Sequence, residues 1–173
     1  MQIPDHAARH IHSASSFDPG SEVHRLVVEL KYHNRRANAL RLGDLLVEAI
    51  RRESSRTGLV FHVVTWAPTS SAHRRRRGFD QSELIARRVA RQLGVPARSL
   101  LRRRGSIAQT GRSRRERLAG PVFSAHRAAR GLRVLVIDDV TTTGATMRAA
   151  QRAFRSVGAE LTVCWAVAAT PAR

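Results

Sequence analysis

The stretch Val134-Leu135-Val136-Ile137-Asp138-Asp139-Val140-Thr141-Thr142-Thr143-Gly144-Ala145-Thr146 decides the fold of this chain of 173 residues. Its first four residues are aliphatic, a pattern typical of a strand that is buried on both faces in a parallel sheet. Two carboxylates follow where that strand is expected to end. Residues 145–154 then have the composition and spacing of a helix. The stretch therefore predicts a strand, a tight loop and a helix N-terminus in direct succession.

This succession predicts a phosphate site beside a sugar site. The N–H groups of the loop and of the first helical turn have no partner within the helix and can point at a phosphate. Thr142, Thr143 and Thr146 add hydroxyl donors, and Gly144 allows a positive φ and a close approach of the backbone. The two carboxylates suit ribose hydroxyls or a hydrated Mg²⁺. A phosphate a short distance from sugar hydroxyls describes a ribose 5-phosphate.

The same residues resemble a family motif. Their order, a hydrophobic strand, Asp-Asp-Val, a Thr-rich turn and Gly-Ala-Thr, is similar to the phosphoribosyl pyrophosphate (PRPP) loop of type I phosphoribosyltransferases. The resemblance implies that Asp138 and Asp139 are catalytic, with Mg²⁺ held mainly by the ligand and by water near them. Thr141 is a departure, because an aliphatic residue is common there. The PRPP-binding residues implied are Asp138, Asp139, Thr141, Thr142, Thr143, Gly144, Ala145 and Thr146.

Other interpretations of the acidic strand can be tested on the sequence. A Walker B strand needs a partner Gly-Lys-Ser/Thr loop, and Lys31, the only lysine, lies in no such motif. The same absence argues against a phosphoryl-receiver domain, which also uses a lysine. No Gly-x-Gly occurs, which excludes the dinucleotide-binding fingerprint. A buried strand with exposed acidic residues on an unrelated α/β domain stays open as an alternative.

Composition limits the class of protein. The net charge of +18 predicts attraction to polyanions, whether nucleic acid, anionic lipid surfaces or a pyrophosphate-bearing substrate. Cys164 is the only cysteine and lies in an apolar strand pattern, so disulfides are expected to play no structural part, which favours a reducing cytoplasm. No apolar run approaches the length of a membrane span. We therefore expect a cytoplasmic protein without a membrane span, and a homodimer stays open.

The length fits one domain, which we expect at 22–173 after a flexible leader at 1–21 that lacks the apolar segment of a signal peptide. Strand patterns alternate with helix patterns, which predicts an α/β fold with a mostly parallel sheet, helices on both faces and helices at the N-terminus. The expected helices are 22–32, 37–52 and 82–93, and the expected strands besides 132–138 are 59–67, 99–101, 122–125 and 160–168.

A loop with four successive arginines is predicted at 69–81, between a strand and a helix, where an α/β sheet gathers its ligands. Within it, Arg77-Gly78-Phe79-Asp80-Gln81 resembles the Arg-Gly-Phe-Asn-Gln motif of the ComF family, which is linked to DNA uptake in competent bacteria. The segments around Lys31-Tyr32-His33, Ser106-Ile107-Ala108-Gln109 and Glu116-Arg117 are similar to other elements of that family. The resemblance implies a type I phosphoribosyltransferase-like fold. It implies contacts to pyrophosphate or a second substrate from Arg77, Gly78, Gln81 and Gln109, with Arg77 also catalytic.

The chain departs from the ComF pattern in three ways. It has no cysteines for the N-terminal four-cysteine zinc module that many members carry. Asp80 stands where the family usually has Asn, and an Asn expected soon after Arg117 is absent, with Gly120 near its place. The basic, polar segment at 102–121 is similar to a mobile loop that closes over PRPP in related enzymes. A solvated basic loop without that role is equally compatible with its sequence.

These observations lead to one main functional hypothesis and two alternatives. We expect a PRPP-binding, Mg²⁺-dependent phosphoribosyltransferase-type protein of the ComF group, that is, a glycosyltransferase of nucleoside metabolism with a link to competence. The first alternative is a nucleic-acid-binding protein on the same scaffold, with single-stranded DNA as its partner. The second is a PRPP sensor without transferase activity, which needs the same phosphate and ribose contacts. The acceptor substrate cannot be read from the sequence.

Overall fold

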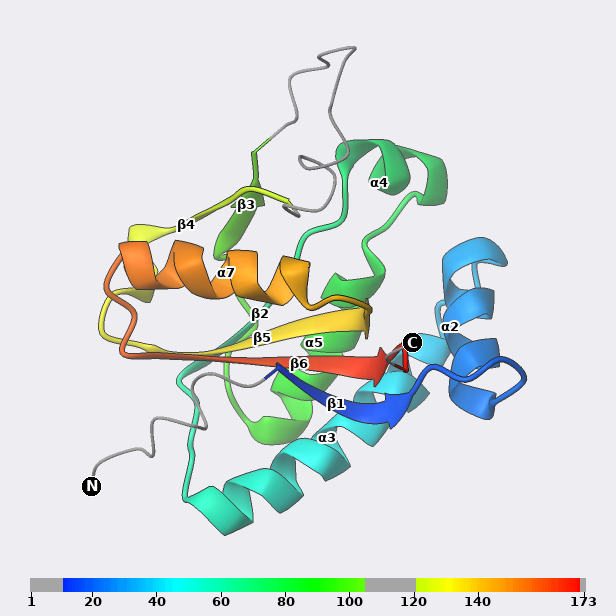
Figure 1. Ribbon diagram of the computed structural model, residues 1–173, viewed down its shortest axis with the longest axis horizontal. Helices are drawn as coiled ribbons and strands as arrows, with labels where there is room; N and C mark the ends of the chain where they lie inside the picture. The colour runs from blue at the N-terminus through cyan, green and yellow to red at the C-terminus, as the bar shows by residue number, and fades with distance from the viewer. Residues whose placement is uncertain (1–10, 105–120, 172–173) are drawn as a thin grey trace.

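The computed structural model describes residues 11–104 and 121–171. At its centre lies a sheet of four strands in the order β1-β6-β5-β2, with every neighbouring pair parallel (Figure 1). This confirms the predicted α/β class and the parallel sheet. The strands are β1 (Ile11–Ser16), β2 (Val63–Trp66), β5 (Arg133–Thr141) and β6 (Leu161–Ala169).

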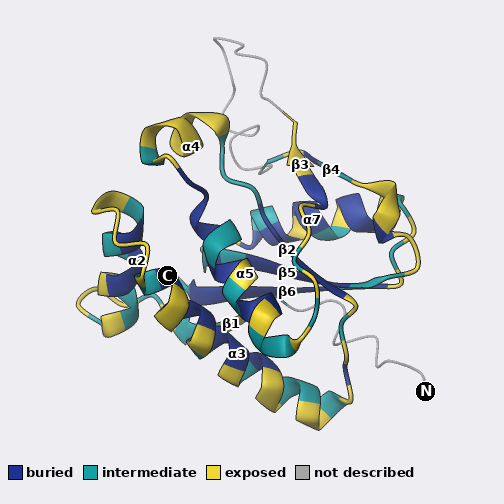
Figure 2. Cartoon of the chain, turned by 180° about the vertical axis from the view of Figure 1, so that it is seen from behind, coloured by how far each residue is buried: buried dark blue, intermediate teal, exposed yellow. Residues whose placement is uncertain are grey.

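Strand β5 occupies the middle of the sheet because its residues can be buried on both faces. Val134 and Val136 pack in one apolar cluster with residues of α7 (Ala145–Ser156). Leu135 and Ile137 pack in a second cluster with α3 (Asn38–Thr57) and α5 (Gln81–Leu93) on the opposite face. Figure 2 shows the buried sides of α3 and α5 turned towards the sheet and their exposed sides turned away. The sheet is therefore covered by helices on both faces, as predicted.

The two predicted N-terminal helices are present, and the second is longer than predicted. Helix α2 (Glu22–Tyr32) starts at Ser21, whose hydroxyl accepts a hydrogen bond from the N–H of His24 at 3.1 Å. Helix α3 continues past the predicted end at residue 52 and stops at Gly58, which has the positive φ of a C-terminal cap. At Gly43 the helix passes so close to α5 that a Cβ would lie 2.8 Å from the Cβ of Arg88. Glycine therefore permits the packing of α3 against α5.

The arginine-rich segment predicted as a loop contains a helix instead, α4 (Ser71–Arg77). The hydroxyl of Ser70 caps its start by accepting from the N–H of His73, and Gly78, with φ 76°, ends it. None of its seven residues is buried, so the segment has no apolar periodicity that a sequence pattern could reveal. The helix is defined by its two caps.

The prediction of a flexible leader at 1–21 is wrong for residues 11–16. These residues form β1, an edge strand that pairs with β6 in the register Ile11 to Cys164. The ring of His12 stacks on Trp165 with 4.8 Å between their centroids. The composition Ile-His-Ser-Ala-Ser-Ser has no strand-like apolar alternation, because only one side of this strand is paired. Residues 1–10 lie outside the described part of the chain.

A small second sheet lies apart from the main one. Strands β3 (Leu101–Arg103) and β4 (Phe123–Ala125) pair in antiparallel fashion, and Leu101 and Phe123 join the apolar cluster around α7. The short 3-10 helix η1 (Arg127–Ala129) follows β4. The predicted mobile loop lies largely at 105–120, outside the described residues. Among those described, no helix has the length and apolarity to cross a membrane.

Candidate PRPP site at the carboxyl edge of the sheet

The two acidic residues lie within the last part of β5. The strand extends to Thr141, three residues beyond the end predicted at 138, and Asp138 pairs in register with Ala166 of β6. Since all four strands are parallel, this position is the carboxyl edge of the sheet, where open α/β folds bind their ligands. In Figure 1 the end of β5 faces the region of α2 and α4.

The carboxylate of Asp138 is held by α5. The hydroxyl of Ser82, a buried residue of that helix, donates to Oδ1 of Asp138 at 2.8 Å, and the N–H of Asp139 donates to the same oxygen at 2.9 Å. Among the described residues no donor contacts the other oxygen, Oδ2, which leaves it for a ligand. Burial raises the pKa of Asp138, and the negative charge of Asp139 raises it further, while the bond from Ser82 opposes the rise.

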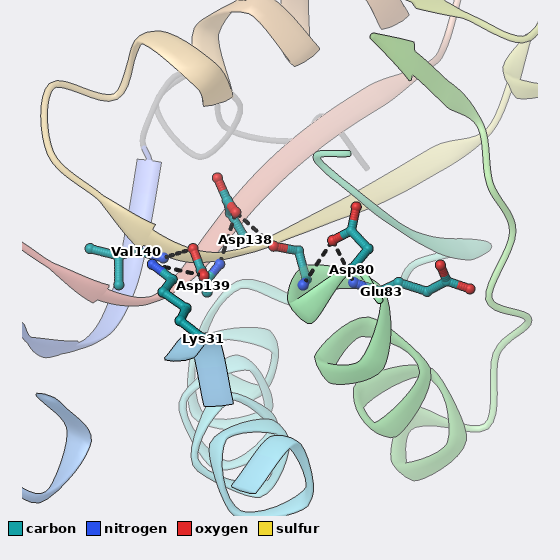
Figure 3. A network of polar contacts seen from close by, with 7 residues as sticks. Lys31, Asp80, Glu83, Asp138, Asp139 and Val140 are labelled. Carbon is teal, nitrogen blue, oxygen red and sulfur yellow. Dashed lines mark hydrogen bonds and ion pairs between the residues drawn. The ribbon is translucent and has the colours of Figure 1, made fainter. Parts of the chain in front are cut away.

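The carboxylate of Asp139 has two partners (Figure 3). The N–H of Val140 donates to Oδ1 at 2.7 Å, and Nζ of Lys31 lies 2.9 Å from Oδ2. The side chains of Lys31 and Asp139 are 18% and 7% exposed, so the ion pair is largely shielded from water. Neither Lys31 nor Ser82 was among the predicted site residues. The one available signal was that Lys31 is the only lysine and lies in a segment resembling the ComF family.

The loop after β5 leads directly into α7. Gly144, with φ 71°, is the cap residue of the helix and has no side chain to accept a hydrogen bond, whereas the hydroxyl of Thr143 accepts from the N–H of Ala145 at 3.4 Å. The guanidinium of Arg148 folds back and donates to the carbonyl oxygen of Thr143 at 2.6 Å. A Cβ at Gly144 would lie 2.6 Å from Cδ1 of Ile11, so only glycine fits there without a shift. Apart from that of Ala145, the first-turn N–H groups of α7 have no side-chain partner among the described residues and suit an anion, although binding by residues 141–146 stays a prediction.

Arg77 and Gly78 lie at the end of α4. The guanidinium of Arg77, in the last turn of α4, lies 5.4 Å from the ring centroid of Tyr32, and its buried Nε has no hydrogen-bond partner in the described chain. A cavity of about 480 Å³ separates α4 from the end of α2. Because Lys31 both lines this cavity and contacts Asp139, the cavity adjoins the acidic pair. Its lining consists of Lys31, Tyr32, Asn34, Arg76, Arg77 and Phe79.

Asp80 caps a helix, which accounts for a carboxylate where the ComF motif has Asn. Its Oδ1 accepts from the N–H groups of Ser82 and Glu83, at 3.1 Å and 3.4 Å, and its Oδ2 accepts from the N–H of Thr69 at 2.8 Å. All three partners are donors, so a group with two acceptor oxygens satisfies them. Burial raises the pKa of Asp80, and these backbone hydrogen bonds oppose the rise.

The remaining predicted contacts are less closely associated with the acids. Gln81 is buried, its Oε1 has no hydrogen-bond partner within the described ranges, and it lines neither of the two cavities described. Gln109, with its neighbours at 105–120, lies outside the described residues. Residues 141–146 line neither cavity.

A second cavity of about 1,230 Å³ was not predicted as a site. It lies between the end of β2, the starts of α4 and α5, and the β3–β4 pair. Five arginines contribute to its wall, namely Arg74, Arg87, Arg102, Arg103 and Arg104. Arg87 also lies over the ring of Trp66 and pairs with Glu83. Its lining therefore provides several cations next to the site at the end of β5.

Comparison with protein families gives a match to the phosphoribosyl transferase domain over residues 80–173, more than half of the chain. This protein belongs to the phosphoribosyl transferase domain family. The match begins at Asp80 and includes α5, β5, α7 and β6, the elements that carry Ser82 and the acidic pair. Lys31 and Arg77 lie before the matched region, so part of the candidate site of this phosphoribosyltransferase-domain protein lies outside it.

Individual relatives agree with this assignment. The DNA utilization protein YhgH of Salmonella typhi is 29% identical over 164 residues, which cover 91% of this chain and 71% of the relative. The protein of the same name from Escherichia coli O157:H7 is 27% identical over 151 residues, covering 84% of this chain and 66% of that relative. Together with the domain match, these relatives are consistent with the predicted relation to phosphoribosyltransferase-like proteins.

Solved structures show the same fold. Glutamine PRPP amidotransferase from B. subtilis superposes with a TM-score of 0.50 at 24% identity, covering 75% of this chain and 26% of that enzyme. A structure described as the allosteric regulatory enzyme of purine biosynthesis gives the same TM-score and identity, with 25% of its chain covered. The phosphoribosyltransferase-domain protein therefore corresponds to about a quarter of each enzyme, and the likeness concerns the fold alone.

Proposed function

We propose that this protein binds PRPP at the end of β5 and is a phosphoribosyltransferase-type protein with a role in DNA use. One observation carries the proposal. The N-terminus of α7 follows Asp138 and Asp139 at the carboxyl edge of the sheet, with only residues 140–144 between them. Phosphate donors and sugar-hydroxyl acceptors therefore come from one continuous segment. The family match over 80–173 and the name of the YhgH relatives support this proposal.

Each part of the site has a separate task in the proposed reaction. The N–H groups of the loop and of α7 bind the 5′-phosphate, and the two carboxylates accept hydrogen bonds from the ribose hydroxyls. As the bond between C1 and the pyrophosphate oxygen breaks, positive charge develops on the sugar, and the nearby carboxylates stabilise it. The guanidinium of Arg77 stabilises the departing pyrophosphate through charge-assisted hydrogen bonds. The acceptor then forms its bond to C1.

The acidic pair fits Mg²⁺ that the ligand itself carries. No group of three His, Cys, Asp or Glu side chains in the described ranges is placed to hold a metal. The accessible Oδ2 of Asp138 suits a hydrogen bond from a water of a hydrated ion, which is how Mg²⁺ commonly meets protein carboxylates. When bound, the ion would neutralise charge on the diphosphate. Arg77 and Lys31, which line the adjacent cavity, would share that task.

Calorimetry with PRPP tests the proposal. In the presence of Mg²⁺ we expect saturable binding of PRPP, and chelation of the metal should weaken it by roughly tenfold or more, since the diphosphate then keeps its full charge. Inorganic phosphate should bind far more weakly. If PRPP binds no better than inorganic phosphate, the proposed function is wrong. Release of pyrophosphate in the presence of candidate nucleobases then separates a transferase from a PRPP sensor.

Binding of single-stranded nucleic acid is a second candidate function, favoured by the larger cavity. Arg74, Arg102 and Arg104 in its wall are exposed, and the net charge of the chain is +18. Exposed guanidinium groups bind phosphates without regard to base sequence. The cavity lies beside the proposed PRPP site, so the two functions are compatible.

Nucleic-acid binding is expected to depend steeply on salt. If these three arginines each neutralise one phosphate, the affinity for an oligonucleotide should fall roughly twentyfold between 50 and 200 mM salt, as measured by fluorescence anisotropy. Replacing all three with Met should flatten this dependence. A matched variant that loses Arg25, Arg152 and Arg155, which are exposed on α2 and α7, should keep it. Affinity that is insensitive to salt would contradict this function.

A further inference from the structure

The ammonium of Lys31 contacts the one oxygen of Asp139 that accepts no backbone hydrogen bond within the described residues. Of the two oxygens of Asp139, Oδ1 accepts from the N–H of Val140 and Oδ2 lies 2.9 Å from Nζ of Lys31. The carboxylate is buried, with 5% of the residue exposed. Because Oδ2 is itself buried and Lys31 lies against it, a sugar hydroxyl that donates to this oxygen would compete with the ammonium.

The backbone of Lys31 is fixed by helix α2, whereas the end of its side chain has space to move. Helix α2 is fixed by the buried side chains of Leu26, Val27 and Leu30. The side-chain amide of Asn38 adds hydrogen bonds to the carbonyl of Leu26 at 3.3 Å and to Glu29 at 2.8 Å. The backbone at Lys31 is thus held in place, whereas its four-carbon side chain lines the cavity of about 480 Å³ that Arg77 also lines. The cavity therefore offers space into which the ammonium could turn without any movement of the helix.

We propose that Lys31 is a positioning residue that orients the carboxylate of Asp139 and is displaced from it by the vicinal hydroxyls of a ribose 5-phosphate. The inference rests on the proposed function, since it requires the sugar at the acidic pair. It assigns to the N-terminal helix, which lies outside the family match at 80–173, a direct response to ligand binding. A lysine that served only as a structural counter-ion would keep its contact with Asp139 when the ligand binds.

The displacement follows from the chemistry of the two partners. Two adjacent carboxylates at the end of β5 repel each other, and a nearby ammonium reduces the cost of keeping them buried. A vicinal diol can donate to both carboxylates at once, which a single ammonium at Oδ2 of Asp139 does not do. Once released, the ammonium reaches the cavity beside Arg77, where an anionic substituent at C1 of the sugar would lie. The positive charge therefore moves towards the leaving group as the sugar binds.

The unique lysine allows a direct test by NMR. Because Lys31 is the only lysine in the chain, protein labelled with ¹³C,¹⁵N-lysine gives a single set of lysine side-chain signals. Asp139→Asn supplies the reference shift for Lys31 without its partner, and urea-unfolded wild-type protein supplies a second reference that does not depend on the variant folding. Saturating ribose 5-phosphate should move the Nζ and Cε signals of wild-type protein towards these references. Inorganic phosphate, which has no hydroxyls for Asp139, should leave them in place.

Calorimetry on the same samples separates the two proposals. If ribose 5-phosphate binds and the lysine signals stay where they are, the displacement of Lys31 is wrong and the proposed function stands. If ribose 5-phosphate does not bind, the displacement of Lys31 by its hydroxyls is wrong, and the proposed function depends on the measurement with PRPP alone. In Asp139→Asn, addition of ribose 5-phosphate should change the lysine signals little, since no ion pair remains to be broken. A shift in that variant as large as in the wild type would also overturn the inference.

Discussion

Replacing both Asp138 and Asp139 with Asn is expected to weaken PRPP binding by roughly a hundredfold or more while the protein stays folded. Hydrogen bonds to charged groups contribute about 1.5–3 kcal/mol each, and about 1.4 kcal/mol corresponds to a factor of ten in affinity. The double variant loses the charge of both acceptors and turns one oxygen of each into a donor. Asn keeps nearly the same shape, and its oxygen can still accept from Ser82 and Val140 at the positions observed.

Calorimetry with PRPP and Mg²⁺ measures this loss, and circular dichroism monitors the fold. A matched control changes Asp44 to Asn and Glu48 to Gln on α3, since both acids are exposed and their removal alters the net charge equally. The control should bind PRPP like the wild type. Unchanged affinity in the double variant would remove the acidic pair from the site, and an equal loss in the control would reduce the effect to net charge.

The single change Asp138→Asn is expected to have the largest effect on stability, and to be stabilising at neutral pH. Burial and the charge of Asp139 raise the pKa of Asp138 above its ordinary value of 3.8. The folded protein therefore binds this proton more tightly than the unfolded chain, so the free energy of unfolding falls as the pH rises from about 4 through the raised pKa. The amide of the variant is neutral at every pH, so the variant does not lose this stability. The loss that it avoids is about 1.4 kcal/mol for each unit by which the pKa is raised.

Urea unfolding between pH 4 and pH 8 measures this gain. The free energy of unfolding of the variant should exceed that of the wild type at pH 8, and the difference should become small towards pH 4, which is close to the ordinary pKa of 3.8 that the carboxyl has in the unfolded chain. Asp139→Asn should instead lower the free energy of unfolding, because it leaves the largely buried ammonium of Lys31 without its partner. A variant at position 138 that is less stable than the wild type at pH 8 would contradict this interpretation. Substitution of a site residue is expected to stabilise a protein when that residue is kept for function at a cost in stability.

The sequence pattern identifies the centre of the fold because physical periodicity is strong there. Val134 to Ile137 are aliphatic on both faces of β5, and each face meets its own helix layer. The start of α7 can also be predicted, because Gly144 and the small residues around it favour a tight turn before the helix. These two features are sufficient to predict the candidate phosphate site from the amino-acid sequence.

Other parts of the structure carry no local pattern. Helix α4 has no buried residue, and its only signals are the caps Ser70 and Gly78. Strand β1 is a polar edge strand, and it depends on backbone pairing with β6. The contacts of Ser82 and Lys31 with the acidic pair join segments distant in the chain, and such contacts depend on the assembled sheet. A single sequence gives the residue types that take part in these contacts, but it does not show that they lie close together in the fold.

A crystal structure of the protein with PRPP and Mg²⁺ would test the central claim most directly. We expect the 5′-phosphate to lie on the N–H groups of residues 143–146 at the start of α7, with the ribose hydroxyls donating to Asp138 and Asp139. The diphosphate should lie towards Arg77 in the cavity beside α2. A ligand bound instead among Arg102, Arg103 and Arg104, with the end of β5 left empty, would contradict the assignment of this edge as the PRPP site.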